Sequence, residues 1–136
     1  MNRADEDFFV STDQALLDLD LVCAMLHGSY WAQHRPRPVI EESIRNSVCF
    51  GVYERKSGKQ AGFARIVTDK ATFCWLCDVF IDETHRRKGL GKLLMAAVVA
   101  HPWVRDSVCL LGTADAHGLY EQYGFRRSEQ MKRPPG

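Results

Sequence analysis

The sequence has almost no excess of charge of either sign. Its 18 lysine and arginine residues are balanced by 17 aspartate and glutamate residues, which gives a formal net charge of +1 over 136 residues. Proteins that bind nucleic acid or an anionic membrane through charge carry a clear basic excess. The composition therefore predicts neither nucleic acid nor a membrane as a partner.

Long apolar runs are also missing. No stretch approaches the roughly 20 apolar residues that a membrane-spanning helix needs. The first residues, Met1 to Asp7, lack the apolar segment of a secretory signal peptide. We therefore predict a cytoplasmic protein with a single domain over residues 1–136, whose ends at 1–6 and 128–136 are loose.

The cysteines are few and lack a metal-ligand pattern. They number five and lie within apolar segments, so we expect free thiols at Cys23, Cys49, Cys74, Cys77 and Cys109. Cys74 and Cys77 are three residues apart, and on a strand such residues point to opposite faces of the sheet. Because no second Cys or His pair has ligand spacing, we predict no metal site.

The hydrophobic pattern predicts an α/β sandwich around a mixed, mostly antiparallel sheet. Strands are expected over 7–11, 48–53, 61–67, 72–81 and 107–112 and near Phe125. Helices are expected up to about His27, over 39–45 and 89–100, and from Asp115. The expected order of elements is β-α-α-β-β-β-α-β-α-β, in which the three central strands form a meander.

One segment joins an apolar strand, a basic glycine turn and an amphipathic helix without interruption. Apolar residues recur at helical spacing from Leu90, so Gly89 and Gly91 lie at the start of a helix. The first N–H groups of a helix have no internal partner and the helix dipole is positive there, which favours an anionic ligand. Basic side chains flank the turn at Arg86, Arg87, Lys88 and Lys92. We predict a phosphate-binding turn, and the alternative is a basic turn that only caps the helix.

Two common phosphate-binding patterns do not fit this turn. The dinucleotide fingerprint requires a third glycine where this chain has Leu94, and the P-loop requires Gly-Lys followed by Ser or Thr. The pattern that remains is Arg86-x-x-Gly89-x-Gly91. It resembles the acyl-CoA pyrophosphate-binding motif of the GNAT superfamily of N-acyltransferases, which is Gln/Arg-x-x-Gly-x-Gly/Ala.

A second segment carries the same resemblance. The residues Ala116-His-Gly-Leu-Tyr120-Glu-Gln-Tyr-Gly124-Phe125 resemble the Ala-x-x-x-Tyr-Glu-x-x-Gly-Phe ending of the GNAT superfamily. The order and separation of the two segments are also similar to those of the superfamily. The resemblance covers residues 46–127, and it implies direct transfer of an acetyl group from acetyl-CoA to an amine.

The resemblance also implies roles for individual residues. The turn from Arg86 to Lys92, Leu90 included, would bind the CoA pyrophosphate, and backbone groups of the preceding strand would pair with the pantetheine arm at Cys77, Val79 and Ile81. Tyr120 takes the position of the general acid that protonates the departing thiolate. A core tyrosine is the alternative. Thr113 stands where the family often has an asparagine that contacts the pantetheine, and His117 precedes Tyr120 by one helical turn.

The acceptor side is less defined by the sequence. Asp78 is a carboxylate within an apolar strand, where burial without a partner is costly. Two interpretations stay open for Asp78. In the first, the carboxylate accepts a proton from the substrate ammonium or anchors a cationic substrate. In the second, the side chain points outward past a bulge and bonds to a neighbouring strand. A bound water is the alternative base. The resemblance implies an acceptor wall at Tyr30 and Trp31, with Glu41 or Glu42, and packing of the aromatic pair on the sheet is the alternative.

The nature of the acceptor is open to three interpretations. The modest length of the chain favours a small-molecule amine. A protein or peptide amine acetyltransferase and a non-catalytic acyl-CoA sensor are the alternatives. Because folds of this kind leave sheet edges open, we also expect a possible homodimer.

Overall fold

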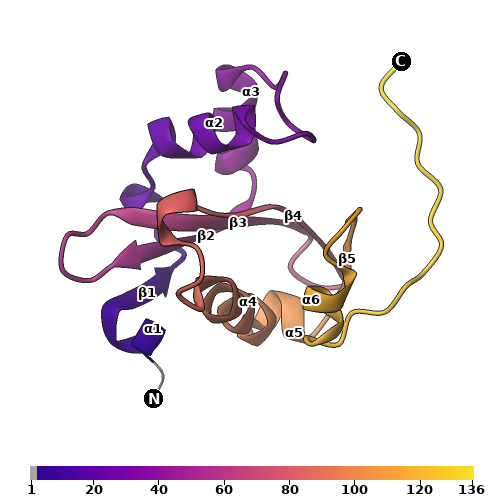
Figure 1. Cartoon of the computed structure of the whole chain (residues 1–136). Coiled ribbons are helices and arrows are strands. Elements are labelled where there is room, and N and C mark those ends of the chain that lie inside the picture. The colour runs from indigo at the N-terminus through magenta and orange to yellow at the C-terminus, as the bar shows by residue number, and fades with distance from the viewer. Residues whose placement is uncertain (1–2) are drawn as a thin grey trace.

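A five-stranded mixed sheet forms the centre of the computed structural model, which describes residues 3–136 (Figure 1). The strands lie in chain order: β1 (Phe8–Ser11), β2 (Val48–Glu54), β3 (Gln60–Thr68), β4 (Phe73–Ile81) and β5 (Val108–Leu111). The pairs β1–β2, β2–β3 and β3–β4 are antiparallel, and β5 runs parallel to β4. This arrangement confirms the predicted α/β class and the mixed, mostly antiparallel sheet.

Helices cover both faces of the sheet and make three layers (Figure 1). One face carries α2 (Leu19–His27) and α3 (Arg37–Arg45), and the other carries α4 (Leu90–Ala100) and α5 (Pro102–Arg105). The remaining elements are short: α1 (Arg3–Asp7), η1 (Gln14–Leu16), η2 (Glu83–His85) and α6 (His117–Glu121).

Each face of the sheet has its own apolar core. The larger core packs Phe50 of β2 against Leu94 of α4. The smaller core packs Phe63 of β3 against Leu26 of α2 and Ile40 of α3. Because successive residues of a strand point to opposite faces, the same strands hold α4 on one side and the α2–α3 loop on the other.

Strand β4 contains a β-bulge at Asp78. The register with β3 moves from Arg65 opposite Cys77 to Phe63 opposite Phe80, so three steps along β4 match two along β3. Asp78 has a φ of 53°, in the left-handed region that aspartate tolerates better than most residues. The bulge changes which backbone groups of β4 face the sheet and which face away from it.

The structure differs from the prediction near both ends of the chain. Residues 3–6, expected to be loose, belong to α1, where Ala4 is buried in the larger core; residues 1 and 2 lie outside the described part. The strand expected near Phe125 is absent, because residues 122–136 contain no helix or strand. Phe125 is followed by mostly polar and charged residues, so this segment has no alternating apolar face to bury.

Helix boundaries also shift around two prolines. The helix expected from Val39 begins at Arg37, which places Pro38 in its first turn. His101 ends α4 as expected, but it also caps a separate helix, α5, that begins with Pro102. Proline suits the first turn of a helix, where its missing N–H is not needed.

All five cysteines are free thiols, as predicted. Three are buried and two, Cys77 and Cys109, are half-buried. Over residues 3–136, no helix combines the length and the apolarity needed to cross a membrane. The same residues contain no group of three or more His, Cys, Asp and Glu side chains that is arranged to hold a metal ion.

Candidate active site

The turn between β4 and α4 presents backbone N–H groups without acceptors. Gly89 caps the start of α4 with a φ of 77°, a conformation that favours glycine, and it offers no side chain to the first N–H groups of the helix. The first intrahelical bond runs from the N–H of Leu93 to the carbonyl of Gly89. Within residues 3–136, no acceptor therefore meets the N–H groups of Leu90, Gly91 and Lys92.

Open space lies beside these N–H groups. A Cβ atom at position 91 would meet no atom within 4 Å, so packing does not require a glycine there. Leu90 anchors the turn in the larger core, where it is 1% exposed. The flanking basic side chains are all exposed: Arg86, Arg87, Lys88 and Lys92. The turn thus combines free donors, positive charge and space, which is what an anionic ligand requires.

Strand β4 is paired on both sides only in its first half. Its pairing with β5 runs from Phe73 opposite Val108 to Leu76 opposite Leu111, and within the described part of the chain residues 77–81 have no strand partner on that side. Past the bulge, the N–H of Asp82 bonds to a carbonyl of β3. The direction of the backbone hydrogen bonds alternates from residue to residue along a strand. The backbone groups of Phe80, two residues before Asp82, therefore also face β3, and those of Val79 and Ile81 face the open side.

Cys77 lies on the other side of the bulge and faces β3. The carbonyl of Phe73 accepts an N–H from Asp69, so alternate residues of this half of β4, Cys77 among them, direct their backbone groups to β3. Its register partner there is Arg65. Of the three backbone positions assigned from the sequence, Val79 and Ile81 are therefore the two at the open edge.

Helix α6 forms a wall of a cavity of about 640 Å³ beside β5. Three of the predicted site residues line this cavity: Thr113, His117 and Tyr120. The hydroxyl oxygen of Thr113 accepts the N–H of Ala116 at 3.0 Å, so Thr113 caps the turn that leads into α6. The hydroxyl of Tyr123, just after α6, donates to the carbonyl of Lys92 at 3.3 Å. This bond connects the Tyr120 segment to the first turn of α4.

Tyr120 is half-buried and keeps its proton at neutral pH. Its ring packs on the larger core and meets Phe125 edge to face, with centroids 6.0 Å apart. Burial, then the negative charge of Asp115 and then Tyr30 raise the pKa of the Tyr120 hydroxyl.

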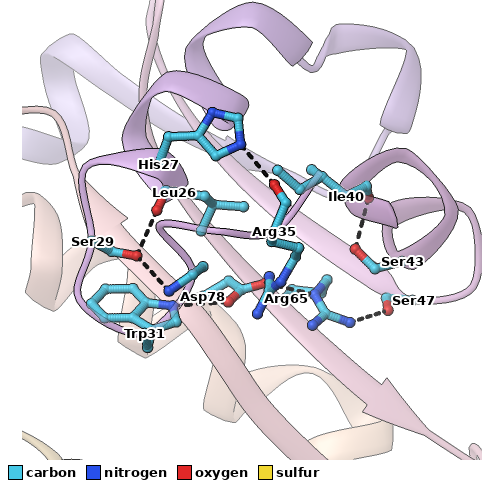
Figure 2. A network of polar contacts seen from close by, with 11 residues as sticks. Leu26, His27, Ser29, Trp31, Arg35, Ile40, Ser43, Ser47, Arg65 and Asp78 are labelled. Atoms are coloured by element: carbon cyan, nitrogen blue, oxygen red, sulfur yellow. Dashed lines mark hydrogen bonds and ion pairs between the residues drawn. The ribbon is translucent and has the colours of Figure 1, made fainter. Parts of the chain in front are cut away.

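The loop between α2 and α3 holds Tyr30 and Trp31 over the bulge of β4. Their rings meet edge to face with centroids 5.2 Å apart, and their exposed fractions are 68% and 45%. The indole Nε1 of Trp31 donates to Oδ1 of Asp78 at 3.0 Å (Figure 2). Glu41 and Glu42 instead form ion pairs with arginines of their own helix, α3.

Asp78 is the centre of a buried polar network (Figure 2). Its Oδ2 accepts from Nη1 of Arg35 and from Nε of Arg65, both at 2.9 Å, and Arg65 also donates to Oγ of Ser47 at 3.0 Å. The Asp78 side chain is only 1% exposed. These contacts are those of the second interpretation, a bond to a neighbouring strand past a bulge. Protein donors surround the carboxylate, so a substrate has little access to it.

Sequence analysis did not identify Arg35 and Arg65. A signal for Arg65 exists, because a charged residue in the middle of an apolar strand lies almost opposite Asp78 once the hairpin between the two strands is formed. No comparable signal exists for Arg35, which lies in the irregular segment between α2 and α3. Only the folded loop brings its guanidinium to the bulge.

The chain is similar to acetyltransferases in sequence and in structure. A family profile described as an acetyltransferase (GNAT) domain matches residues 45–127. A Gibberella zeae protein whose name gives acetyltransferase activity as provisional is 32% identical over 151 aligned positions, which cover 93% of this chain and 85% of that protein. A crystal structure from Xanthomonas campestris pv. campestris, of a provisionally named acetyltransferase assigned to the GNAT family, has 40% identity and a TM-score of 0.89, covering 94% and 93% of the two chains.

A more distant neighbour shows the same fold. Glucosamine-6-phosphate N-acetyltransferase from Arabidopsis thaliana has a TM-score of 0.65 at 20% identity, covering 93% of this chain and 97% of that one. At this identity the likeness concerns the fold alone. It shows that the overall fold recurs in a protein of different sequence.

Proposed function

Because the chain belongs to the GNAT family of acetyltransferases, we propose that it transfers an acetyl group from acetyl-CoA to the primary amine of a small molecule. Family membership accounts for acyl transfer from an acyl-CoA. The proposal goes beyond family membership in naming acetyl-CoA as the donor and a small amine as the acceptor. The observation that carries the proposal is the glycine turn, whose free N–H groups and open space lie at the start of α4.

The residues of the turn and of the open edge fit acetyl-CoA. The N–H groups of Leu90, Gly91 and Lys92 and the basic side chains from Arg86 onward would hold the pyrophosphate. The backbone of Val79 and Ile81 would pair with the amides of the pantetheine arm, and Cys77 is left out because its backbone faces β3. When bound, acetyl-CoA supplies an acetyl thioester that is activated toward a neutral amine.

Tyr120 is the proposed general acid of the reaction. The amine nitrogen forms the new bond to the acetyl carbon, the carbon–sulfur bond breaks, and Tyr120 donates its proton to the sulfur that leaves as a thiolate. The raised pKa of the Tyr120 hydroxyl means that this proton is present over the whole neutral range. Before the attack, the ammonium form of the acceptor loses a proton to a bound water, because Asp78 is enclosed by its protein partners.

Replacing Gly91 with valine is expected to weaken acetyl-CoA binding by at least about tenfold while the fold keeps its stability. The added side chain has room in the free protein, but it fills the space next to the free N–H groups. Calorimetric titration with acetyl-CoA gives the affinity, and thermal unfolding gives the stability. The control is Ala96→Val, which adds a similar side chain to an exposed position of α4. An unchanged affinity in Gly91→Val would show that this turn does not hold the diphosphate.

An assay of free thiol release from acetyl-CoA tests the function itself. The acceptors are amino acids, polyamines, arylalkylamines, aminoglycosides and lysine peptides, each with and without the protein. We expect turnover with at least one class of small amine. Turnover with lysine peptides alone would replace the small-molecule proposal by peptide acetylation. Tight binding of acetyl-CoA without turnover of any acceptor would support the non-catalytic sensor instead.

A further inference from the structure

The loop between α2 and α3 (residues 28–36), which we name the acceptor loop, and the glycine turn approach β4 from opposite faces of the sheet. Val79 and Ile81 pack on the larger core, together with α4. Phe80 packs on the smaller core, between the sheet and helices α2 and α3. Asp78 bonds to Trp31 and Arg35 on that second side (Figure 2). Because the proposed CoA site lies on the α4 side, an acceptor would meet the side chains around the bulge on the α2–α3 side.

This side of the bulge has more positive than negative charge. Two guanidinium groups, those of Arg35 and Arg65, share the single carboxylate of Asp78. Within residues 3–136, neither arginine has a hydrogen bond or ion pair with any other carboxylate. The acidic residues nearest to Arg35 along the chain, Glu41 and Glu42, are already paired with arginines of α3. One positive charge is left uncompensated.

Arg35 is the one of the two arginines that a ligand can reach. The Arg65 side chain is 12% exposed and uses two of its nitrogens, toward Asp78 and Ser47. The Arg35 side chain is 24% exposed and uses only Nη1, so within the described residues its Nε and Nη2 have no acceptor. Its backbone is held as well, because its carbonyl bonds to Nε2 of His27 at 2.7 Å (Figure 2). The guanidinium is thus fixed by one nitrogen and open at the others.

We propose that the free donors of Arg35 bind an anionic group of the acceptor, so that the substrate is an amine that carries a carboxylate or a phosphate near its nitrogen. This inference rests on the proposed function and names the acceptor class of the same reaction. The exposed rings of Tyr30 and Trp31 lie beside this position and would cover the apolar part of such a molecule.

Three physical reasons favour an anionic acceptor over a purely cationic one. A planar guanidinium matches the geometry of carboxylate and phosphate oxygens and binds them through two parallel bonds. A polyamine without an anionic group would instead be repelled by the uncompensated charge. A nearby positive charge also favours the neutral form of the amine, which is the form that attacks.

Matched pairs of acceptors isolate the anionic group. The carboxylate pair is phenylalanine and phenylalaninamide, and the phosphate pair is O-phosphoethanolamine and ethanolamine. For the wild-type protein we expect a kcat/KM at least about tenfold higher for the anionic member of one pair, and the pair that shows it identifies carboxylate or phosphate as the group. Equal or reversed preference in both pairs would overturn the proposal.

Variants of Arg35 show whether the preference comes from this residue. Arg35→Gln should remove the preference, mainly by raising KM for the anionic acceptor, whereas Arg35→Lys keeps the charge and should keep part of it. Arg45→Gln is the control, because Arg45 is an exposed arginine of α3 that pairs with Glu42. A preference that persists in Arg35→Gln would refute the proposal. Acetyl-CoA affinity and the thermal midpoint, measured for each variant, show that the protein is folded.

Binding measurements separate this proposal from the proposed function. The four compounds are titrated by NMR into protein saturated with CoA, so that no turnover is needed. An anionic preference in binding that Arg35→Gln removes supports the proposal even if none of the four compounds is acetylated. The thiol-release assay with the wider set of acceptors then decides the transferase proposal separately. Turnover of the compounds without any anionic preference refutes this inference and leaves the transferase proposal intact.

Discussion

Replacing Tyr120 with phenylalanine is expected to lower kcat/KM by a factor of about 10² to 10⁴, the usual contribution of a general acid, while acetyl-CoA affinity stays near that of the wild type. The substitution removes only the hydroxyl. The ring keeps its contact with Phe125 and with the larger core, so the fold is preserved. Steady-state thiol release gives the rate and calorimetric titration gives the affinity.

Tyr53→Phe is the control for this substitution. Tyr53 is buried in β2, and within the described residues its hydroxyl has no hydrogen-bond partner. The same chemical change is therefore made at a place without a role in the reaction, and we expect a wild-type rate. If Tyr120→Phe also turns over at the wild-type rate, Tyr120 is the core tyrosine of the alternative interpretation.

The pH dependence of the rate tests the same assignment. A general acid must be protonated, and burial raises the pKa of the Tyr120 hydroxyl above its ordinary value near 10. The loss of this proton should therefore lower the wild-type rate only at pH values above that ordinary value. The residual rate of Tyr120→Phe should lack this alkaline limb. If the rate falls between pH 8 and 9 equally in the wild type and in the variant, the group whose titration causes the fall is not Tyr120.

The glycine turn and the helix that follows could be predicted because their signals are local. Helical spacing from Leu90 predicts the start of α4, and Gly89 does lie at that start as its N-cap residue. The three-stranded meander was equally accessible, since period-two runs separated by turn residues are a short-range pattern. These features need no knowledge of distant contacts.

The contacts around Asp78 could be predicted only in part. A carboxylate in an apolar strand shows that a partner is needed, but not which one. The partners come from β3 and from an irregular loop 43 residues away in sequence, and a non-glycine bulge with positive φ has no reliable sequence signal. The same bulge decides that Cys77 faces β3 while Val79 faces the open edge, which simple alternation from either end of the strand would miss.

Replacing Asp78 with asparagine is expected to reduce the free energy of unfolding by about 3 kcal/mol, because a buried charge pair is broken on one side. Arg65 is mostly buried and would lose its counter-charge, and Arg35 would lose its anchor. Asparagine tolerates the φ of 53° as aspartate does, so the substitution changes the charge and not the backbone. Urea unfolding measures the change.

The control for this variant is Asp106→Asn. Asp106 forms an ion pair with Arg105 in which both side chains are well exposed, so its loss should leave the unfolding midpoint unchanged. The double variant Asp78→Asn/Arg65→Met should lose less stability than the sum of the two single variants, because the unpaired buried charge is then removed. Additive losses would mean that Asp78 and Arg65 act independently.

The same variant also decides between the two interpretations of Asp78. If Asp78 only positions the acceptor loop, Asp78→Asn loses stability. At temperatures well below its unfolding midpoint, the rate of the variant still falls toward low pH, because the amine then loses its proton to another group. If Asp78 were the general base, the variant would keep its stability and lose this acid limb of the pH–rate profile. Three protein donors on a carboxylate that is 1% exposed favour the first result, since a base must be within reach of the amine.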